Sequence, residues 1–234
     1  MTQEQKIIRA KLGLLELAKQ LGNVSQACKM TSRPHAESLN LVYGDAPRTR
    51  LDFFATKRPG APTLLFFHGG YWQRNTKDGF SFVAEGPLAR DINVAVAGYT
   101  LAPEARIDRI VREARTALHW LYEHPAALGG DPARLYVGGW SAGGHLTAML
   151  MDEAAVAGGL AVSGLFDLEP IRLCYLNDKL GLDAEEARRN SPLLNLPARA
   201  AKLIIAYGAD ELPELNANHA NSGQHGARAV FRGM

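Results

Sequence analysis

The sequence predicts an α/β protein built around a mostly parallel sheet that is flanked by helices. From about residue 39 onward, short apolar runs alternate with helical patterns. Several of the apolar runs, such as TLLFF at 63–67, are unbroken, which is typical of strands covered on both faces. The helical patterns between them are long enough to serve as the crossovers that parallel strands require.

The individual elements follow from the same patterns. Strands are expected at residues 51–55, 63–67, 93–98, 134–139, 158–163 and 202–207. A helix of about five turns is expected at 106–124, because its apolar residues recur every three or four positions and so share one face. A second helical run, 145–151, follows the fourth strand. The apolar face of the long helix, which we expect in the core, consists of Ile107, Ile110, Val111, Ala114, Leu118 and Leu121.

Composition excludes several classes of protein. The chain has 234 residues, of which 47% are hydrophobic, so it can bury the core of one domain and is not mainly disordered. Its 26 Lys and Arg residues nearly balance 24 Asp and Glu residues, which makes no general case for a nucleic-acid partner. No apolar run approaches the ~18 residues of a membrane span. We expect a protein with no membrane or nucleic-acid partner.

The cysteines and the first residues bear on location. Cys28 and Cys174 are too far apart in the sequence to form a ligand-spaced pair, so we expect neither a disulfide framework nor a metal site. Such cysteine usage is typical of a reducing compartment. The opening MTQEQK lacks the order of a signal peptide. The expected location is the cytoplasm.

The first motif is Gly139-Trp140-Ser141-Ala142-Gly143, a G-x-S-x-G between a predicted strand and a helical run. Its glycines allow a sharp turn that holds the Ser141 hydroxyl clear of the sheet, and the amide of Ala142 then faces the oxygen on which negative charge develops. Ser141 is therefore a candidate nucleophile. The alternative interpretation is a tight turn with a capping serine.

The second motif is His68-Gly69-Gly70-Tyr71-Trp72, just after the strand at 63–67. Glycines let the main chain approach a substrate carbonyl, so Gly69 and Gly70 are candidate oxyanion-hole donors. His68 is expected to support this loop and not to act as the base; a solvent-facing loop histidine is the alternative. Tyr71 and Trp72 either pack in the core or wall a substrate pocket for an aromatic or acyl group.

Together the two motifs resemble the α/β-hydrolase fold of HGG-bearing esterases. Residues 39–215 further resemble the kynurenine formamidase (arylformamidase) branch, in the runs 68–86, 139–146, 163–183, 185–194 and 208–215. The resemblance implies a serine hydrolase that cleaves N-formyl-kynurenine, or related aryl amides and short-chain esters, without a cofactor. It also implies an acyl-enzyme on Ser141, a histidine base and an acid that orients the base. Asp210 fits the acid position, and Glu211 fits it if the loop is shifted by one residue.

The general base is where the chain departs from that family. A helix and a strand separate acid and histidine there, which takes about 25 to 30 residues. Only 23 residues follow Glu211, and His219 and His225 lie among them in a tail without helical periodicity. The sequence thus predicts a sheet that lacks the last helix and strand. A catalytically impaired hydrolase fold is the alternative function, and the exposed sheet edge favours a homo-oligomer.

Both ends of the chain are interpreted as atypical. Residues 1–34 form an expected helical N-terminal extension, which resembles the helix–turn–helix of insertion-sequence transposases over about 30 residues; an ordinary helical cap is the alternative. Residues 35–215 form the expected hydrolase domain. One permissible codon choice for 216–234, read two bases ahead, resembles the family's continuation, so we interpret this tail as frame-shifted. A DNA-binding protein is a third hypothesis, resting on the N-terminal extension alone.

Overall fold

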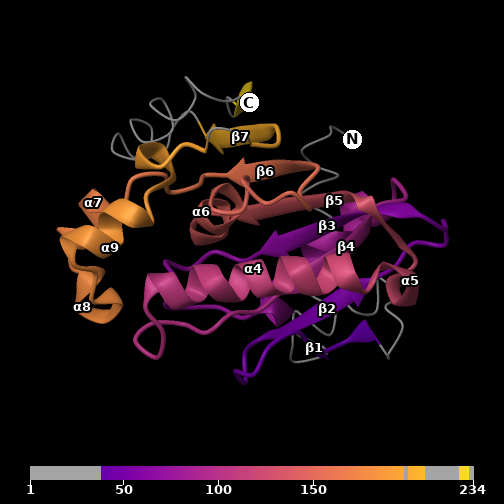
Figure 1. Cartoon of the computed structure of the whole chain (residues 1–234), viewed down its shortest axis with the longest axis horizontal. Helices are drawn as coiled ribbons and strands as arrows, with labels where there is room; N and C mark the ends of the chain where they lie inside the picture. Colours follow the sequence, from indigo (N-terminus) through magenta and orange to yellow (C-terminus); the bar gives the residue numbers. More distant parts are fainter. Residues whose placement is uncertain (1–37, 198–199, 209–226, 232–234) are drawn as a thin grey trace, which may run out of the picture.

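The computed structural model describes residues 38–197, 200–208 and 227–231, and its centre is one eight-stranded sheet (Figure 1). The strands are β1 (Leu41–Val42), β2 (Arg50–Phe54), β3 (Ala61–Phe67), β4 (Asn93–Ala97), β5 (Gly130–Trp140), β6 (Gly158–Val162), β7 (Leu203–Gly208) and β8 (Ala227–Phe231). Their spatial order is β1-β2-β4-β3-β5-β6-β7-β8. The strands from β4 to β8 pair in parallel, whereas β1 and β2 form an antiparallel edge. The predicted mostly parallel α/β sheet is confirmed.

Two central strands, β3 and β4, have no exposed residue, as their unbroken apolar runs predict. All five residues of β4 are buried, and β3 has five buried and two half-buried residues. Each of the six predicted strands coincides with an observed one to within a few residues at either end. β5 begins four residues earlier than predicted, because its first residue, Gly130, already pairs with Ala61 of β3.

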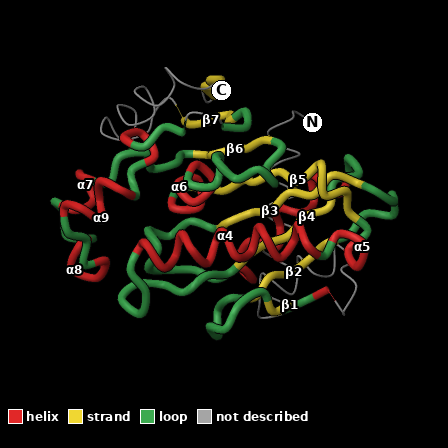
Figure 2. The backbone as a smooth tube through the Cα atoms, viewed as in Figure 1, coloured by secondary structure: helices red, strands yellow, loops and turns green. Residues whose placement is uncertain are grey.

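Helices connect the parallel strands and cover the sheet (Figure 2). They are η2 (Lys77–Ala84), α3 (Glu85–Leu88), α4 (Ile107–Glu123), α5 (Pro125–Leu128), α6 (Ala142–Ala148), α7 (Glu169–Arg172), α8 (Asn177–Leu180), α9 (Ala184–Arg189) and η3 (Pro192–Leu194). α4 is the helix predicted at 106–124, and the six apolar residues of its predicted face are all buried. Helices α7, α8 and α9 gather beyond the carboxyl ends of the strands (Figure 1). No helix within the described residues is long and apolar enough to cross a membrane.

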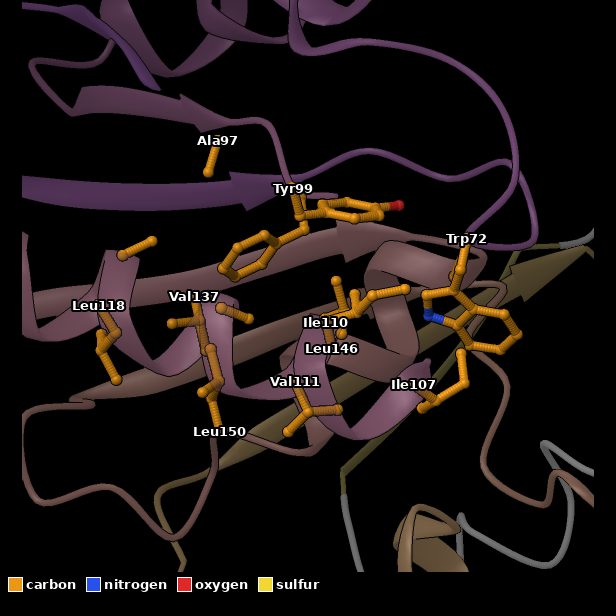
Figure 3. Close-up of a cluster of buried hydrophobic side chains, with 14 of the residues drawn as sticks. Trp72, Ala97, Tyr99, Ile107, Ile110, Val111, Leu118, Val137, Leu146 and Leu150 are labelled. Carbon is orange, nitrogen blue, oxygen red and sulfur yellow. The ribbon is translucent and has the colours of Figure 1, made fainter. Parts of the chain in front are cut away.

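The main core lies between the sheet and the helices α4 and α6. Figure 3 shows Ile110, Leu118 and Leu146 of these helices in one cluster with Val137 of β5. Three of these four side chains come from the helices, and all four are fully buried. Burial of a side chain of this size contributes roughly 1.5–3 kcal/mol. This core holds the carboxyl ends of β3 and β5 in fixed register, with Phe67 opposite Gly139.

A buried carboxylate fastens α9 to the start of α4. Glu186 is fully buried and accepts a hydrogen bond from Arg106 Nε at 2.7 Å and another from the Asp108 amide at 3.2 Å. Nη2 of Arg106 also pairs with Glu186. Arg189 forms an ion pair with Asp108 at 2.6 Å. These contacts, made between residues about 80 positions apart, fix the segment that runs from β6 to β7 against α4.

The expected loss of the last strand is wrong. β8 pairs in parallel with β7 over five positions, from Ile204 opposite Ala227 to Gly208 opposite Phe231. Backbone hydrogen bonding to the open edge of β7 suffices for this pairing, so the strand does not need a long apolar run. β8 therefore covers the edge that was expected to be exposed. The expected N-terminal extension at 1–34 and most of the tail at 216–234 lie outside the described residues.

Candidate active site

The two sequence motifs lie at the point where the connections of the sheet reverse direction. β3 leads through η2 and α3 to β4 on one side, and β5 leads through α6 to β6 on the other side. Because β3 and β5 are parallel neighbours, the loops after them diverge at the same edge. In open α/β sheets, ligands bind at such a switch point, outside the carboxyl ends of the strands. The HGG loop and the G-x-S-x-G turn flank it.

Ser141 occupies a strained turn between β5 and α6. Its φ of 56° and ψ of −116° lie in a region that residues with a β-carbon rarely adopt. The flanking glycines are required by close backbone packing. A β-carbon added at Gly139 would lie 2.3 Å from the carbonyl of Gly143, and one added at Gly143 would lie 2.0 Å from the Phe67 carbonyl oxygen. The turn has the geometry predicted for a nucleophile elbow.

Gly69 packs directly against this turn. A β-carbon added at Gly69 would lie 3.1 Å from Cβ of Ser141 and 2.8 Å from both the carbonyl oxygen and Cε3 of Trp140. The HGG loop and the serine turn are therefore in contact, and Gly69 is needed for that approach. Ala142 begins α6, so its amide is one of those at a helix start that lack an intrahelical acceptor. Of the three residues predicted as oxyanion-hole donors, Gly69 packs against Ser141, Ala142 follows it in the chain, and Gly70 follows Gly69 and packs against Arg74 and Asn75.

His68 is buried inside the loop and does not face solvent. Its ring stacks on Tyr99 with centroids 4.4 Å apart, and its Nδ1 lies 2.9 Å from the Gly69 carbonyl oxygen. Burial lowers the pKa of His68 to about 4, against the opposing effect of the hydrogen bond to Gly69. The ring is therefore neutral near pH 7 and donates to Gly69 when Nδ1 carries the hydrogen. Burial of the ring excludes the solvent-facing alternative, and support of the loop stays a prediction for His68.

Two loop residues that sequence patterns do not single out also hold the glycine pair. The Asn75 side-chain amide donates to the Gly69 carbonyl oxygen at 3.0 Å. Arg48 donates in turn to the Asn75 carbonyl oxygen at 2.5 Å. The Gly70 carbonyl accepts amide hydrogen bonds from Gln73 and Arg74, at 3.0 and 3.1 Å. A lone asparagine or arginine in a polar loop carries no sequence signal for such a contact.

Of the two aromatic residues predicted for a substrate pocket, Trp72 is fully buried. Its ring lies among the side chains of the core cluster (Figure 3), 5.0 Å from the ring of His145 in an edge-on arrangement. The packing alternative therefore describes Trp72, because a buried ring offers no surface to a substrate. Tyr71 is half-buried and also packs against that cluster. The exposed ring beside Ser141 is instead Trp140, which is 44% exposed.

The predicted acid and base lie beyond the described part of the site. β7 ends at Gly208, so Asp210 and Glu211 follow its carboxyl end, but they and the two tail histidines, His219 and His225, lie outside the described residues. Within the described ranges, no imidazole forms a hydrogen bond with the Ser141 hydroxyl.

His145 is the histidine closest to Ser141 in the described sequence, four residues further along the chain. It is fully buried and its Nε2 lies 2.7 Å from the Asn190 carbonyl oxygen. Burial lowers the pKa of His145 to about 4, against the opposing effect of this hydrogen bond. His145 therefore joins α6 to the end of α9 as a neutral buried group.

A cavity of about 720 Å³ lies at the far end of α6, and its lining includes Met149, Phe166, Leu193 and Ile205. None of its described lining residues belongs to either motif, so this cavity is separate from the switch point. Across the described segments, no group of three or more His, Cys, Asp or Glu residues is arranged to hold a metal ion.

Comparison with known families agrees with this architecture. Residues 64–220 match the model of a family whose description is alpha/beta hydrolase fold. Kynurenine formamidases of Danio rerio and Salmo salar are each 30% identical to this chain over 191 residues, which is 75% of the chain and 64% of either relative. The chain thus spans a little under two thirds of the length of these relatives. The carboxylesterase NlhH of Mycobacterium tuberculosis is 38% identical over 104 residues, 44% of the chain and 32% of that protein.

Solved structures show the same fold. A crystal structure of a Silicibacter protein, provisionally assigned as a thioesterase, superposes with a TM-score of 0.80 at 27% identity and covers 90% of this chain and 82% of its own. Esterase 2 of Thermogutta terrifontis superposes with a TM-score of 0.64 at 22% identity, covering 82% of both chains, and this likeness bears on the fold alone.

Proposed function

The chain belongs to the α/β-hydrolase family, and from that premise we propose that it is a serine hydrolase. The proposed substrate is an aryl formamide such as N-formyl-kynurenine, or a short-chain carboxylic ester. The proposal rests on one observation, the packing of Gly69 against Ser141, which brings the candidate nucleophile beside the glycine pair. The kynurenine formamidases and the carboxylesterase among its relatives support this choice of substrates.

In the proposed reaction, the Ser141 hydroxyl oxygen attacks the substrate carbonyl carbon, and negative charge develops on the carbonyl oxygen. The amides of Gly69, Gly70 and Ala142 donate hydrogen bonds to that oxygen. The bond to the leaving amine or alcohol then breaks as its nitrogen or oxygen takes up a proton. The acyl group remains as an ester on Ser141 until water releases it. The chemistry needs no cofactor.

A histidine serves as general base and acid in this proposal, oriented by a carboxylate. Asp210 is the preferred carboxylate and Glu211 the second candidate, because both follow the carboxyl end of β7 in the sequence. His219 and His225 are the histidines that follow them. Separate alanine substitutions at these four positions, each measured for turnover, identify which pair acts.

The aromatic surface next to Ser141 supports an aryl substrate. Trp140 and Phe82 are 44% and 45% exposed, and the ring of Phe80 lies between them, with centroids 6.1 Å from Trp140 and 5.8 Å from Phe82. Cε3 of Trp140 and Cβ of Ser141 approach the same point of Gly69. Exposed rings of this kind stack favourably with an aromatic group of a ligand. In the proposed pocket, Trp140, Phe80 and Phe82 form the aromatic wall that was predicted for Trp72.

A catalytically impaired hydrolase fold is the second candidate. It is favoured by the two described histidines that lie in or near the motifs: His68 and His145 are both buried and neutral, and each is hydrogen-bonded to a backbone carbonyl. If neither His219 nor His225 reaches Ser141, the chain keeps a serine turn without a base. Loss of a catalytic-triad residue of this kind lowers turnover by about 10⁴–10⁶.

Turnover by the full chain separates these two functions. The measurement is hydrolysis of N-formyl-kynurenine and of p-nitrophenyl acetate, with Ser141→Ala as the test variant. Ser163→Ala is the matched control, because Ser163 also has a positive φ and follows the neighbouring strand β6. We expect turnover that Ser141→Ala abolishes and Ser163→Ala retains. A folded chain that turns over neither substrate supports the impaired hydrolase, and turnover that survives in Ser141→Ala contradicts both.

A further inference from the structure

A closed ring of hydrogen bonds surrounds the HGG loop. Arg48 donates from Nε to the Tyr99 carbonyl oxygen at 3.0 Å and from Nη2 to the Asn75 carbonyl oxygen at 2.5 Å. The Tyr99 hydroxyl donates to the His68 carbonyl oxygen at 2.8 Å. Asn75 closes the ring through its side-chain amide, which donates to the Gly69 carbonyl oxygen at 3.0 Å.

The Gly69 carbonyl is the point on which this ring converges. It accepts from Asn75 Nδ2 on one side and lies 2.9 Å from His68 Nδ1 on the other. The peptide group between Gly69 and Gly70 is planar and trans, so its N–H points opposite to its C=O. Contacts that fix the Gly69 carbonyl therefore also fix the direction of the Gly70 amide, one of the proposed oxyanion-hole donors.

Asn75 suits this role by its backbone as well as its side chain. Its φ of 76° lies in the left-handed region, which asparagine tolerates better than most residues. Its Nδ2 also packs against Gly70, where an added β-carbon would lie only 2.8 Å away. Asn75 is exposed, so replacing it does not open a cavity in the core.

We propose that Asn75 is a positioning residue for the oxyanion hole. Its side-chain amide holds the Gly69 carbonyl, and the Gly70 N–H is thereby directed at the substrate carbonyl oxygen. Asn75 itself touches neither the substrate nor Ser141 in this scheme. The inference rests on the proposed serine-hydrolase function and adds a residue that acts through the Gly69–Gly70 peptide.

The test compares an oxygen ester with its sulfur analogue. The variant is Asn75→Gly, which keeps the positive φ and removes the amide. The substrates are p-nitrophenyl acetate and the thiono ester in which sulfur replaces the carbonyl oxygen. Because sulfur is a poor hydrogen-bond acceptor, the thiono ester gains little from the oxyanion-hole donors. Loss of a whole donor costs about 10²–10³ in kcat, so misdirecting one is expected to cost roughly 10-fold with the oxygen ester.

The ratio of the two rates separates positioning from folding. We expect kcat for the oxygen ester to fall about 10-fold with KM nearly unchanged, and the oxygen-to-sulfur rate ratio to fall by a similar factor. Thr76→Ala, a change at the exposed neighbouring residue, should leave the ratio unaltered. Equal losses with both esters in Asn75→Gly, leaving the ratio intact, would overturn the proposal, because they indicate only fewer folded molecules.

A second measurement tests whether Asn75 fixes the Gly69 carbonyl, and it does not require turnover. If the unaltered chain has no turnover, the proposed hydrolase function fails, but this test of Asn75 still applies. The ¹³C′ chemical shift of the Gly69 carbonyl reports the hydrogen bonds it accepts. We expect this resonance and the Gly70 amide resonance to move in Asn75→Gly but not in Thr76→Ala. Unmoved resonances in Asn75→Gly contradict the positioning role regardless of activity.

Discussion

Gly69 and Ser141 pack backbone against side chain across the ends of two neighbouring parallel strands. A β-carbon added at Gly69 would approach Cβ of Ser141 to 3.1 Å. Strand register explains the contact: Phe67 of β3 lies opposite Gly139 of β5, so the residues two positions further along each strand meet at the same edge. A motif contributed by residues 68–72 and one contributed by 139–143 thus lie side by side.

Backbone strain at Ser141 predicts an unusual pair of stability effects. Ser141→Gly should raise the free energy of unfolding by about 1 kcal/mol, because glycine adopts a φ of 56° without the steric cost of a β-carbon. Ser141→Ala removes the same hydroxyl but keeps the β-carbon, so its stability should stay near that of the unaltered chain. Urea denaturation of the three proteins checks this. Equal stability of the two variants would show that the turn is unstrained.

Close packing of α6 against β3 predicts that Gly143 tolerates no side chain. In Gly143→Ala, the new methyl group would lie 2.0 Å from the Phe67 carbonyl oxygen, so the helix must shift away from the strand. We expect a loss of about 3 kcal/mol or more in unfolding free energy, together with loss of activity. Gly86→Ala in α3 is the matched control, since open space surrounds that position. Similar melting temperatures for the two variants would refute the packing argument.

The two buried histidines predict that acid destabilises the fold. The pKa values of His68 and His145 are lowered to about 4, so between pH 6.5 and 4 the unfolded chain binds protons that the native chain does not. The unfolding free energy should therefore fall as the pH drops below 6.5, by up to about 3 kcal/mol per histidine. Urea melts at pH 7.0, 6.0 and 5.0 measure the slope. In His145→Asn, one fewer proton is taken up on unfolding, so the slope of the unfolding free energy against pH should be smaller. A stability that does not depend on pH would contradict the burial of both rings as neutral groups.

The buried carboxylate of Glu186 predicts a large effect at a position far from Ser141 in the sequence. Glu186→Ala leaves the Asp108 amide and the Arg106 guanidinium without their shared acceptor, so we expect a loss of about 3 kcal/mol. Glu169→Ala breaks an exposed ion pair with Arg172 and should have no measurable effect. Thermal melts of both variants check the contrast. A mild effect of Glu186→Ala would mean that solvent replaces these contacts.

The parts of the fold that sequence patterns predict are those that depend on local periodicity. Unbroken apolar runs such as 63–67 belong to strands buried on both faces, and the six-residue apolar stripe of α4 needs only its own spacing. The serine turn is equally local, because its glycines and Ser141 are adjacent in the chain. The apolar run before the turn and the helical run after it then predict that the turn lies between a strand and a helix.

Features that depend on distant partners escaped such prediction. β8 forms because β7 presents an open edge, whereas the five-residue segment ARAVF, interrupted by Arg228, is too short and broken an apolar run to indicate a strand by itself. Trp72 follows a glycine loop that suggests a pocket wall, yet the core accommodates its ring completely. The contact between Asn75 and Gly69 exists only because the loop folds back on itself, with Arg48 holding it from a segment 27 residues away.

The most direct test of the central claim is the site of covalent labelling by a fluorophosphonate probe. The probe forms a bond only with a serine whose hydroxyl is activated and whose surroundings stabilise the developing charge on the phosphoryl oxygen. Digestion and mass spectrometry of the labelled chain should locate the adduct on the peptide that contains Ser141, and Ser141→Ala should remove it. An adduct on a different residue, or none on the folded chain, would contradict the account.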